Sequence, residues 1–205
     1  MAAMVAYDRG DVPRIQHFVK VHNFAATIAA AEGLDSATTF ILETAAILHD
    51  IGIHPAEKKY GNSNGKYQEE LGPAEADRLL RSLGGYTDEQ IERVCFLIGH
   101  HHTFKGVDGM DWQILLEADF LVNSYEDNIS PEAIRTFEKN VFKTQTGKQL
   151  LEAMWGFQAT DNASDTKPLT PYEQYCREQA KEQEEEFDDS RCFPEQPEGQ
   201  FVRGH

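Results

Sequence analysis

Hydrophobic residues recur through most of this chain at intervals of three and four positions, the spacing that places side chains on one face of an α-helix. The clearest case runs from Asp11 to about Glu32, with Pro13 in the first turn, as is common at helix starts. Its apolar stripe consists of Phe18, Val21, Phe24, Ala25 and Ile28. No segment up to residue 157 alternates convincingly between apolar and polar residues. The pattern therefore predicts helices rather than strands.

The helical spacing continues to residue 157, interrupted by residues that typically start or end helices. Starts are expected at Asp35, Pro73, Thr87, Asp111, Ser130 and Gly147, and ends at about Gly52, Gly84 and Phe157. Thr87 and Gln90 have the spacing of a capping box, in which each side chain bonds the other residue's backbone N–H. Residues 54–65 are polar and end in Gly-Asn-Ser-Asn-Gly, which predicts a loop. We expect one all-α domain of about six to eight helices over residues 10–157.

Composition favours a globular protein. The chain has 205 residues, of which 40% are hydrophobic, enough for one domain with a core and an appendage. No run approaches the roughly 20 apolar residues of a membrane-spanning helix, and the first residues lack the features of a signal peptide. We therefore expect a cytoplasmic protein with no membrane partner. Its three widely spaced cysteines form no CxxC pattern and indicate neither a disulfide framework nor a cysteine zinc site.

The formal net charge is −16, and it is unevenly distributed. Residues 158–205 hold 12 acidic against 5 basic side chains, a balance of −7, and are rich in polar residues and proline. This composition predicts an acidic tail that is peripheral or partly disordered. An acidic surface repels phosphate backbones, so duplex nucleic acid is not an expected partner. A small phosphorylated substrate stays compatible, because a metal ion can invert the field within a cleft.

The adjacent residues His49 and Asp50 are the first candidates for chemistry. They follow an apolar run and precede Ile51 and Gly52. A histidine and a carboxylate side by side offer one metal ion a nitrogen and an oxygen ligand. Such a dipeptide also occurs by chance, so its meaning depends on the residues that accompany it.

Three further residues fall on the predicted inner faces of other helices. His17 lies four residues before Val21, and Asp119 lies four residues after Leu115. His101 continues a stripe formed by residues 94, 97 and 98. His102 is expected to reach the same cavity, whereas Glu117 is expected to face outward or to support a ligand.

Each of these residues has an ordinary explanation when it is considered alone, such as a hydrogen-bonded histidine in a core. Four separate helices that all direct imidazole or carboxylate groups inward are harder to explain in that way. The alternative to a metal is a buried web of histidine–aspartate ion pairs, which is costly to desolvate. The pattern therefore favours a divalent metal site.

The order His17, His49-Asp50, His101, Asp119 resembles the HD-domain phosphohydrolase superfamily, which is named for its histidine–aspartate doublet. The surrounding residues are similar as well, namely 14–17, 45–52 and 116–119. The resemblance covers roughly residues 10–157 and implies an all-helical, HD-type metal-binding domain. It also implies that one or two divalent ions (Mn, Mg, Fe, Ni, Co or Zn) are held by His17, His49, Asp50 and Asp119.

One position departs from the family pattern. Members with two metals often carry a histidine four residues before a glycine, on the helix that follows the doublet, and here Gln68 occupies that place before Gly72. A carboxylate from Glu69 or Glu70 is one candidate replacement. The other arrangement has a single ion, with His101 and His102 as substrate contacts rather than ligands.

Roles for the remaining candidates follow from metal chemistry. Asp50 can bind metal through one oxygen and accept a proton through the other, which makes it a candidate general base. His101 and His102 are candidate proton donors to a phosphate or leaving oxygen. Four basic residues, three of them around the glycine-bearing loop, are candidate substrate contacts, although an ordinary solvated loop explains that segment equally well: Arg14, Lys58, Lys59 and Lys66.

The leading hypothesis is therefore a metal-dependent phosphohydrolase that acts on a small phosphomonoester or a nucleotide. One alternative is a di-iron oxygenase of the same fold, which the absence of a histidine at position 68 disfavours. Another is a non-catalytic module that senses a nucleotide or a metal. A homo-oligomer is compatible with all three hypotheses.

Overall fold

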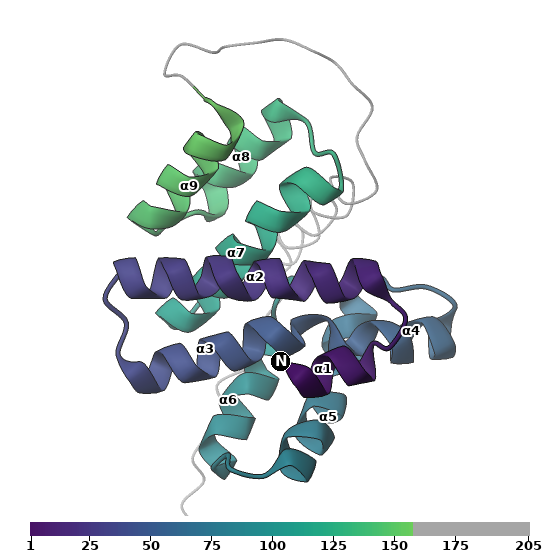
Figure 1. The fold of residues 1–205 in the computed structure, drawn as a ribbon. Helices are drawn as coiled ribbons and strands as arrows, with labels where there is room; N and C mark the ends of the chain where they lie inside the picture. Colours follow the sequence, from purple (N-terminus) through teal and green to yellow (C-terminus); the bar gives the residue numbers. More distant parts are fainter. Residues whose placement is uncertain (158–205) are drawn as a thin grey trace, which may run out of the picture. The chain divides into compact units, whose positions relative to one another are not determined.

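The computed structural model describes residues 1–157, which fold entirely into helices and their connections (Figure 1). The α-helices are α1 (Ala2–Tyr7), α2 (Val12–Ala31), α3 (Ser36–Leu48), α4 (Ile53–Tyr60), α5 (Gly65–Leu83), α6 (Asp88–Ile98), α7 (Met110–Glu126), α8 (Pro131–Val141) and α9 (Gln145–Trp155), and a 3-10 helix, η1 (His49–Gly52), follows α3. The predicted all-α fold is confirmed. The predicted acidic tail, 158–205, lies outside the described residues. Within residues 1–157, no helix combines the length and apolar character needed to cross a bilayer.

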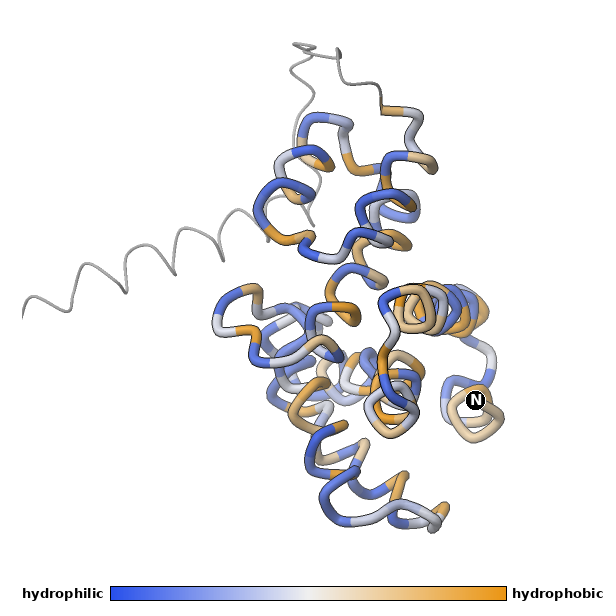
Figure 2. Tube along the Cα trace, turned by 90° about the vertical axis from the view of Figure 1, so that its left-hand side faces the viewer, coloured by the Kyte–Doolittle hydropathy of each residue, from blue (hydrophilic) through white to orange (hydrophobic). Residues whose placement is uncertain are grey.

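Helices α2, α3 and α7 form the centre of this domain. Helix α2 packs against both α3 and α7, and α2 and α3 lie side by side in Figure 1. Along most helices hydrophobic and hydrophilic positions are interleaved, as expected where only one face is buried (Figure 2). Helix α7 differs, because every residue from Asp111 to Val122 is buried. Polar side chains in this part of α7 therefore face neighbouring helices rather than water.

Most predicted helix starts are confirmed by their capping contacts. Asp35 Oδ1 accepts hydrogen bonds from the backbone N–H groups of residues 37 and 38. Thr87 and Gln90 form both hydrogen bonds of the predicted capping box. The Ser130 side chain caps α8 by accepting from Ala133 N at 3.3 Å. These ends are determined by local sequence, because cap and helix lie within one turn.

Other boundaries were predicted wrongly. Most of α4 lies in the segment expected to be a loop; only Ile53 and Ala56 of this helix are buried, which is consistent with its largely polar sequence. Helix α5 starts at Gly65, where Asn64 caps it, so Pro73 lies inside the helix rather than at its start. Helix α3 ends at residue 48, not 52. Helices α7 and α9 begin slightly earlier than predicted, after the N-caps Gly109 and Thr144.

A close backbone approach joins η1 to α5. A Cβ atom on Gly52 would lie 2.6 Å from the backbone oxygen of Gln68, and one on Gly72 would lie 2.7 Å from the Ile98 side chain. Only glycine fits at these two positions without moving its neighbours. The approach brings the histidine–aspartate doublet next to α5 and the end of α6.

Candidate metal centre

The doublet lies where α3 tightens into η1. His49 is completely buried, and the Asp50 side chain retains 18% exposure. His49 Nε2 lies 3.5 Å from Asp50 Oδ2, so these consecutive side chains face a common point.

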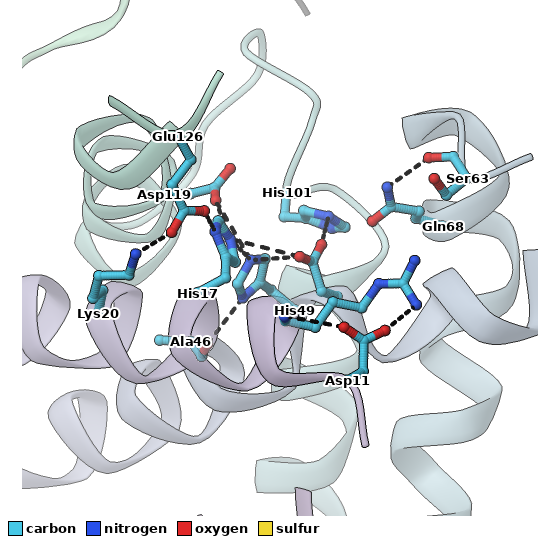
Figure 3. A network of polar contacts seen from close by, with 12 residues as sticks. Asp11, His17, Lys20, Ala46, His49, Ser63, Gln68, His101, Asp119 and Glu126 are labelled. Carbon is cyan, nitrogen blue, oxygen red and sulfur yellow. Dashed lines mark hydrogen bonds and ion pairs between the residues drawn. The ribbon is translucent and has the colours of Figure 1, made fainter. Parts of the chain in front are cut away.

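Two other helices direct polar atoms to the same point (Figure 3). His17 of α2 places its Nε2 3.1 Å from His49 Nε2 and 3.2 Å from Asp119 Oδ1 of α7. His49 Nε2 is 3.4 Å from the same Asp119 oxygen, and His17 Nε2 is 3.6 Å from Asp50 Oδ2. The structure thus brings together the four residues expected to hold a metal.

A second group shares Asp50 with the first. His101 is 1% exposed, and its Nε2 lies 3.6 Å from Asp50 Oδ1, the oxygen that the first group does not use. His102 is also buried, with its ring centroid 4.0 Å from that of His101. Within each of the two groups, His17–His49–Asp50 and Asp50–His101–His102, the potential ligand atoms lie within 4.8 Å of one another.

Hydrogen bonds at the far side of the rings determine which nitrogen faces the cluster. His49 Nδ1 donates to the carbonyl of Ala46 at 2.9 Å, and His101 Nδ1 donates to the carbonyl of Ile98 at 2.6 Å. A carbonyl only accepts, so each Nδ1 carries the proton, and each neutral ring leaves its Nε2 as a lone-pair donor. His17 Nδ1 similarly contacts Glu126 Oε2 at 2.7 Å. The bare nitrogens therefore face the cluster.

This arrangement fits a cation. Neutral imidazole nitrogens and carboxylate oxygens that converge in a buried space are all acceptors, and they repel one another unless protons or a metal ion lie between them. Without a metal, burial opposes a charged ring, but hydrogen bonds with Asp119 and Glu126 raise the pKa of His17 well above its ordinary value. The pKa of His101 is also raised, because its contact with Asp50 outweighs burial.

The pKa values of the two aspartates are lowered, whereas those of His17 and His101 are raised. Burial alone would raise the pKa of Asp50, yet its electrostatic interaction with His49 and its contact with His101 hold it well below its usual value. Hydrogen bonds with His17 and His49 likewise lower the pKa of Asp119 against the effect of burial. Burial lowers the pKa of His102 to about 3, so this ring stays neutral and suited to ligation at neutral pH.

The structure does not bring Glu70 or Lys59 into the cluster. Glu70 is on the exposed side of α5, where its Oε1 accepts from Lys59 Nζ at 2.9 Å and from Tyr60 Oη at 2.7 Å. Lys58 and Lys66 are exposed, at the end of α4 and the start of α5 respectively. These residues lie on the surface near the predicted loop.

Arg14 also has partners of its own. Its guanidinium pairs with Asp11 Oδ2 and with Glu57 Oε1, each at 2.6 Å, and so joins the start of α2 to α4. It also contacts His54 Nδ1 at 3.2 Å. Its charge is therefore compensated within the protein.

The position of Glu117 corrects the expectation that it faces outward or supports a ligand. It is fully buried rather than outward-facing, and its Oε1 accepts from Gln113 Nε2 at 2.7 Å. The same oxygen accepts from the backbone N–H groups of Lys143 at 2.6 Å and Thr144 at 3.0 Å, and Thr144 Oγ1 donates to Oε2. Glu117 therefore anchors the connection between α8 and α9. The expectation was wrong because α7 is buried on all sides.

Sequence reasoning missed Glu126. It contacts His17 through Oε2 and Lys20 through Oε1, so it orients the imidazole from behind. It lies seven residues after Asp119, which places it on the same face of α7, and this spacing is the signal that could have found it.

Comparisons with known proteins agree with this geometry. The model of the HD domain matches residues 14–138. The chain is similar to the crystal structure of a predicted HD superfamily hydrolase from an uncultured Thermotogales bacterium, with 27% sequence identity and a TM-score of 0.54. That similarity covers 76% of this chain and 83% of the other. A comparison with curated proteins found no match. With the doublet, its partner residues and the helical fold in place, the chain belongs to the HD-domain family, a superfamily of metal-dependent hydrolases.

Proposed function

We propose that the protein is a metal-dependent phosphohydrolase that acts on a small phosphomonoester or a nucleotide. The observation that carries the proposal is the buried set of acceptor atoms around His17, His49, Asp50 and Asp119, which come from three separate elements. The similarity to a predicted HD superfamily hydrolase supports the same class of reaction.

The proposed ligands divide into two sets that share one carboxylate. His17, His49, Asp50 and Asp119 would hold one divalent ion, drawn from Mn, Mg, Fe, Ni, Co or Zn, and Asp50 with His101 and His102 would hold a second. Such ions would polarise the phosphoryl group, neutralise its developing charge and lower the pKa of water. Glu126 would keep Nε2 of His17 directed at the cation, because it holds the opposite nitrogen.

The role of Asp50 depends on how many ions bind. With one ion, Oδ1 of Asp50 would stay available as the general base, and His101, whose pKa is raised, would donate a proton to the phosphate or leaving oxygen. The neutral His102 ring would contact the substrate by hydrogen bonding. If two ions bind, Asp50, His101 and His102 would instead serve as ligands. The metal count therefore assigns these roles.

The basic residues have a secondary part in the proposal. Arg14 and Lys59 are already paired with carboxylates, so their charges contribute little to binding a phosphate. Lys58 and Lys66 are exposed, and we assign them to the more distant parts of a substrate such as a nucleotide. The principal attraction for the phosphate would come from the bound cations.

The test combines elemental analysis of the purified protein with a panel of phosphomonoesters and nucleotides, each assayed with several divalent metals. The wild type is expected to hydrolyse members of the panel. His49→Ala and Asp50→Asn are expected to lose both bound metal and activity, the latter by roughly 10³-fold, which corresponds to the several kcal/mol that a cation supplies. Glu70→Gln, an exposed carboxylate variant on the adjacent helix, serves as the control and should retain both.

Three outcomes would overturn the proposal. Full activity in a metal-free His49→Ala, Asp50→Asn double variant would exclude metal-dependent hydrolysis at this site. Two redox-active irons per chain without phosphatase activity would favour the oxygenase alternative. Nucleotide binding without turnover, across all metals, would favour the sensing alternative.

A further inference from the structure

Gln68 presents a buried acceptor that the interactions described above leave unused. The residue lies on α5 with 7% exposure. Its Nε2 donates to the backbone carbonyl of Ser63 at 2.8 Å, whereas its Oε1 is buried and has no hydrogen-bond partner. Because Ser63 offers a carbonyl, the nitrogen must face it, and this contact orients the amide. Figure 3 shows the nitrogen toward Ser63 and the oxygen on the side of His101.

The position of Gln68 is enforced by backbone packing. The backbone oxygen of Gln68 would lie only 2.6 Å from a Cβ on Gly52, so the backbones of α5 and η1 are too close for any side chain at position 52. Glu69, the next residue, accepts from His102 N at 2.9 Å and from Thr103 Oγ1 at 3.0 Å. These contacts fasten α5 to the doublet on one side and to the turn that carries His101 and His102 on the other.

A second buried acceptor lies nearby without a hydrogen bond. His101 Nε2 has no hydrogen-bond partner, and its closest recorded charged atom is Asp50 Oδ1 at 3.6 Å. A buried polar atom without a partner destabilises the fold. Gln68 Oε1 lies on the side of its amide that faces His101, and His101 Nε2 faces Asp50 Oδ1. Two acceptors cannot satisfy each other, whereas a cation between them would.

We propose that Gln68 Oε1 is the neutral oxygen ligand that completes a second cation site formed with Asp50, His101 and His102. The inference rests on the metal centre of the proposed function and assigns the residue that stands where two-metal relatives carry a histidine. A neutral amide oxygen favours hard, oxygen-preferring ions such as Mn²⁺ or Mg²⁺. The second site binds more weakly than the first, because the first has two carboxylates and the second has only the shared one.

The test is calorimetric titration of the metal-free, full-length protein with Mn²⁺ alone. The wild type is expected to bind two equivalents with separable affinities. Gln68→Met keeps the size of the side chain but removes the oxygen, and it should weaken only the second equivalent, by roughly 10–100-fold. Gln68→Glu adds a charge at the same place and should tighten that equivalent. Glu70→Gln is the matched control on the exposed side of α5 and should change neither affinity.

A single equivalent of Mn²⁺ in the wild type would overturn the inference. Unchanged affinities in Gln68→Met would do so as well, and so would a Gln68→Glu protein that folds, by circular dichroism, but binds the second ion no more tightly. The two proposals fail separately. Gln68-dependent binding of two ions without phosphatase activity would leave this site standing and remove the hydrolase. Phosphatase activity with Gln68-independent binding would do the reverse.

Discussion

Glu117 and Asp119 are two buried carboxylates, two residues apart on α7, and they have opposite surroundings. Glu117 receives hydrogen bonds from an amide side chain, two backbone N–H groups and a hydroxyl. Asp119 faces the Nε2 atoms of His17 and His49, whose opposite nitrogens are held by other groups. The first carboxylate is satisfied by the protein alone, whereas the second is satisfied only with an added proton or cation. Burial by itself therefore does not identify a functional carboxylate, but the balance of donors around it does.

The difference arises from what each side of α7 meets. Glu117 lies against the start of α9, where unpaired backbone N–H groups attract a negative charge. Asp119 lies against α2 and η1, which contribute His17 and His49 beside its carboxylate. Gly147 belongs to the Glu117 side, because a Cβ there would collide with the Glu117 carboxylate. Helix α7 thus uses Glu117 for a structural contact and Asp119, two residues later, for the candidate metal centre.

The largest expected effect is on metal affinity and turnover, which should depend on Asp119 but not on Glu117. Asp119→Asn should lower metal affinity on the order of 10²-fold and phosphatase turnover on the order of 10³-fold, since a metal supplies several kcal/mol of transition-state stabilisation. Glu117→Gln should leave both within about twofold, because its side chain contacts none of the proposed ligands. Metal analysis and turnover measured on the same preparations check this. Equal losses in both variants would break the comparison.

The next expected effect is on stability, where loss of the Glu117 side chain should matter most. Glu117→Ala would leave the N–H groups of Lys143 and Thr144 and the Thr144 hydroxyl without their acceptor. At about 1–3 kcal/mol for each buried group that stays unpaired, we expect a loss of roughly 3 kcal/mol in the free energy of unfolding. Urea unfolding of the metal-free protein measures it, with exposed Glu70→Ala as a control expected to change by less than about 0.5 kcal/mol. A loss below about 1 kcal/mol for Glu117→Ala would contradict its anchoring role.

The smallest effect is a pH dependence that only the Asp119 side should show. In the metal-free protein the pKa values of His17 and His101 are raised, so at lower pH each ring holds a proton on the nitrogen that a cation needs. Metal binding must displace these protons. The affinity for metal should therefore fall about tenfold for each unit by which the pH is lowered, for each proton displaced. It should level off once the pH exceeds the raised pKa values. Titrations with Mn²⁺ between about pH 6 and pH 8 measure the slope.

Glu126 sharpens that measurement. Its hydrogen bond is one of the causes that raise the pKa of His17, after the hydrogen bond with Asp119. Glu126→Gln should therefore shift the pH at which affinity levels off to a lower value, which a loss of packing alone would not do. A profile that coincides with that of the wild type would show that Glu126 does not tune this imidazole.

Periodicity in the sequence was sufficient for much of the fold and for the central candidate ligands. Helical spacing identified the inner faces that carry His17 and Asp119, and the capping box at Thr87 depends only on residues within one turn. His101 is buried as expected, but it lies in the turn after α6 rather than on the helix. The histidine–aspartate doublet was visible as a dipeptide. These features are local, because a helix repeats every 3.6 residues and an inward side chain is recognised by its apolar neighbours.

Only the tertiary structure decided the surroundings of Glu117 and Gln68, and it showed that Glu126 contacts His17. Spacing along one helix indicates which side of it is buried, but not which atoms of other helices lie there. Glu117 is buried because the start of α9 packs against α7, and Gln68 lies next to η1 because two glycines allow η1 and α5 to approach closely. Such contacts join residues that are distant in the sequence, and whether each polar group meets a donor or an acceptor is determined only when the helices pack.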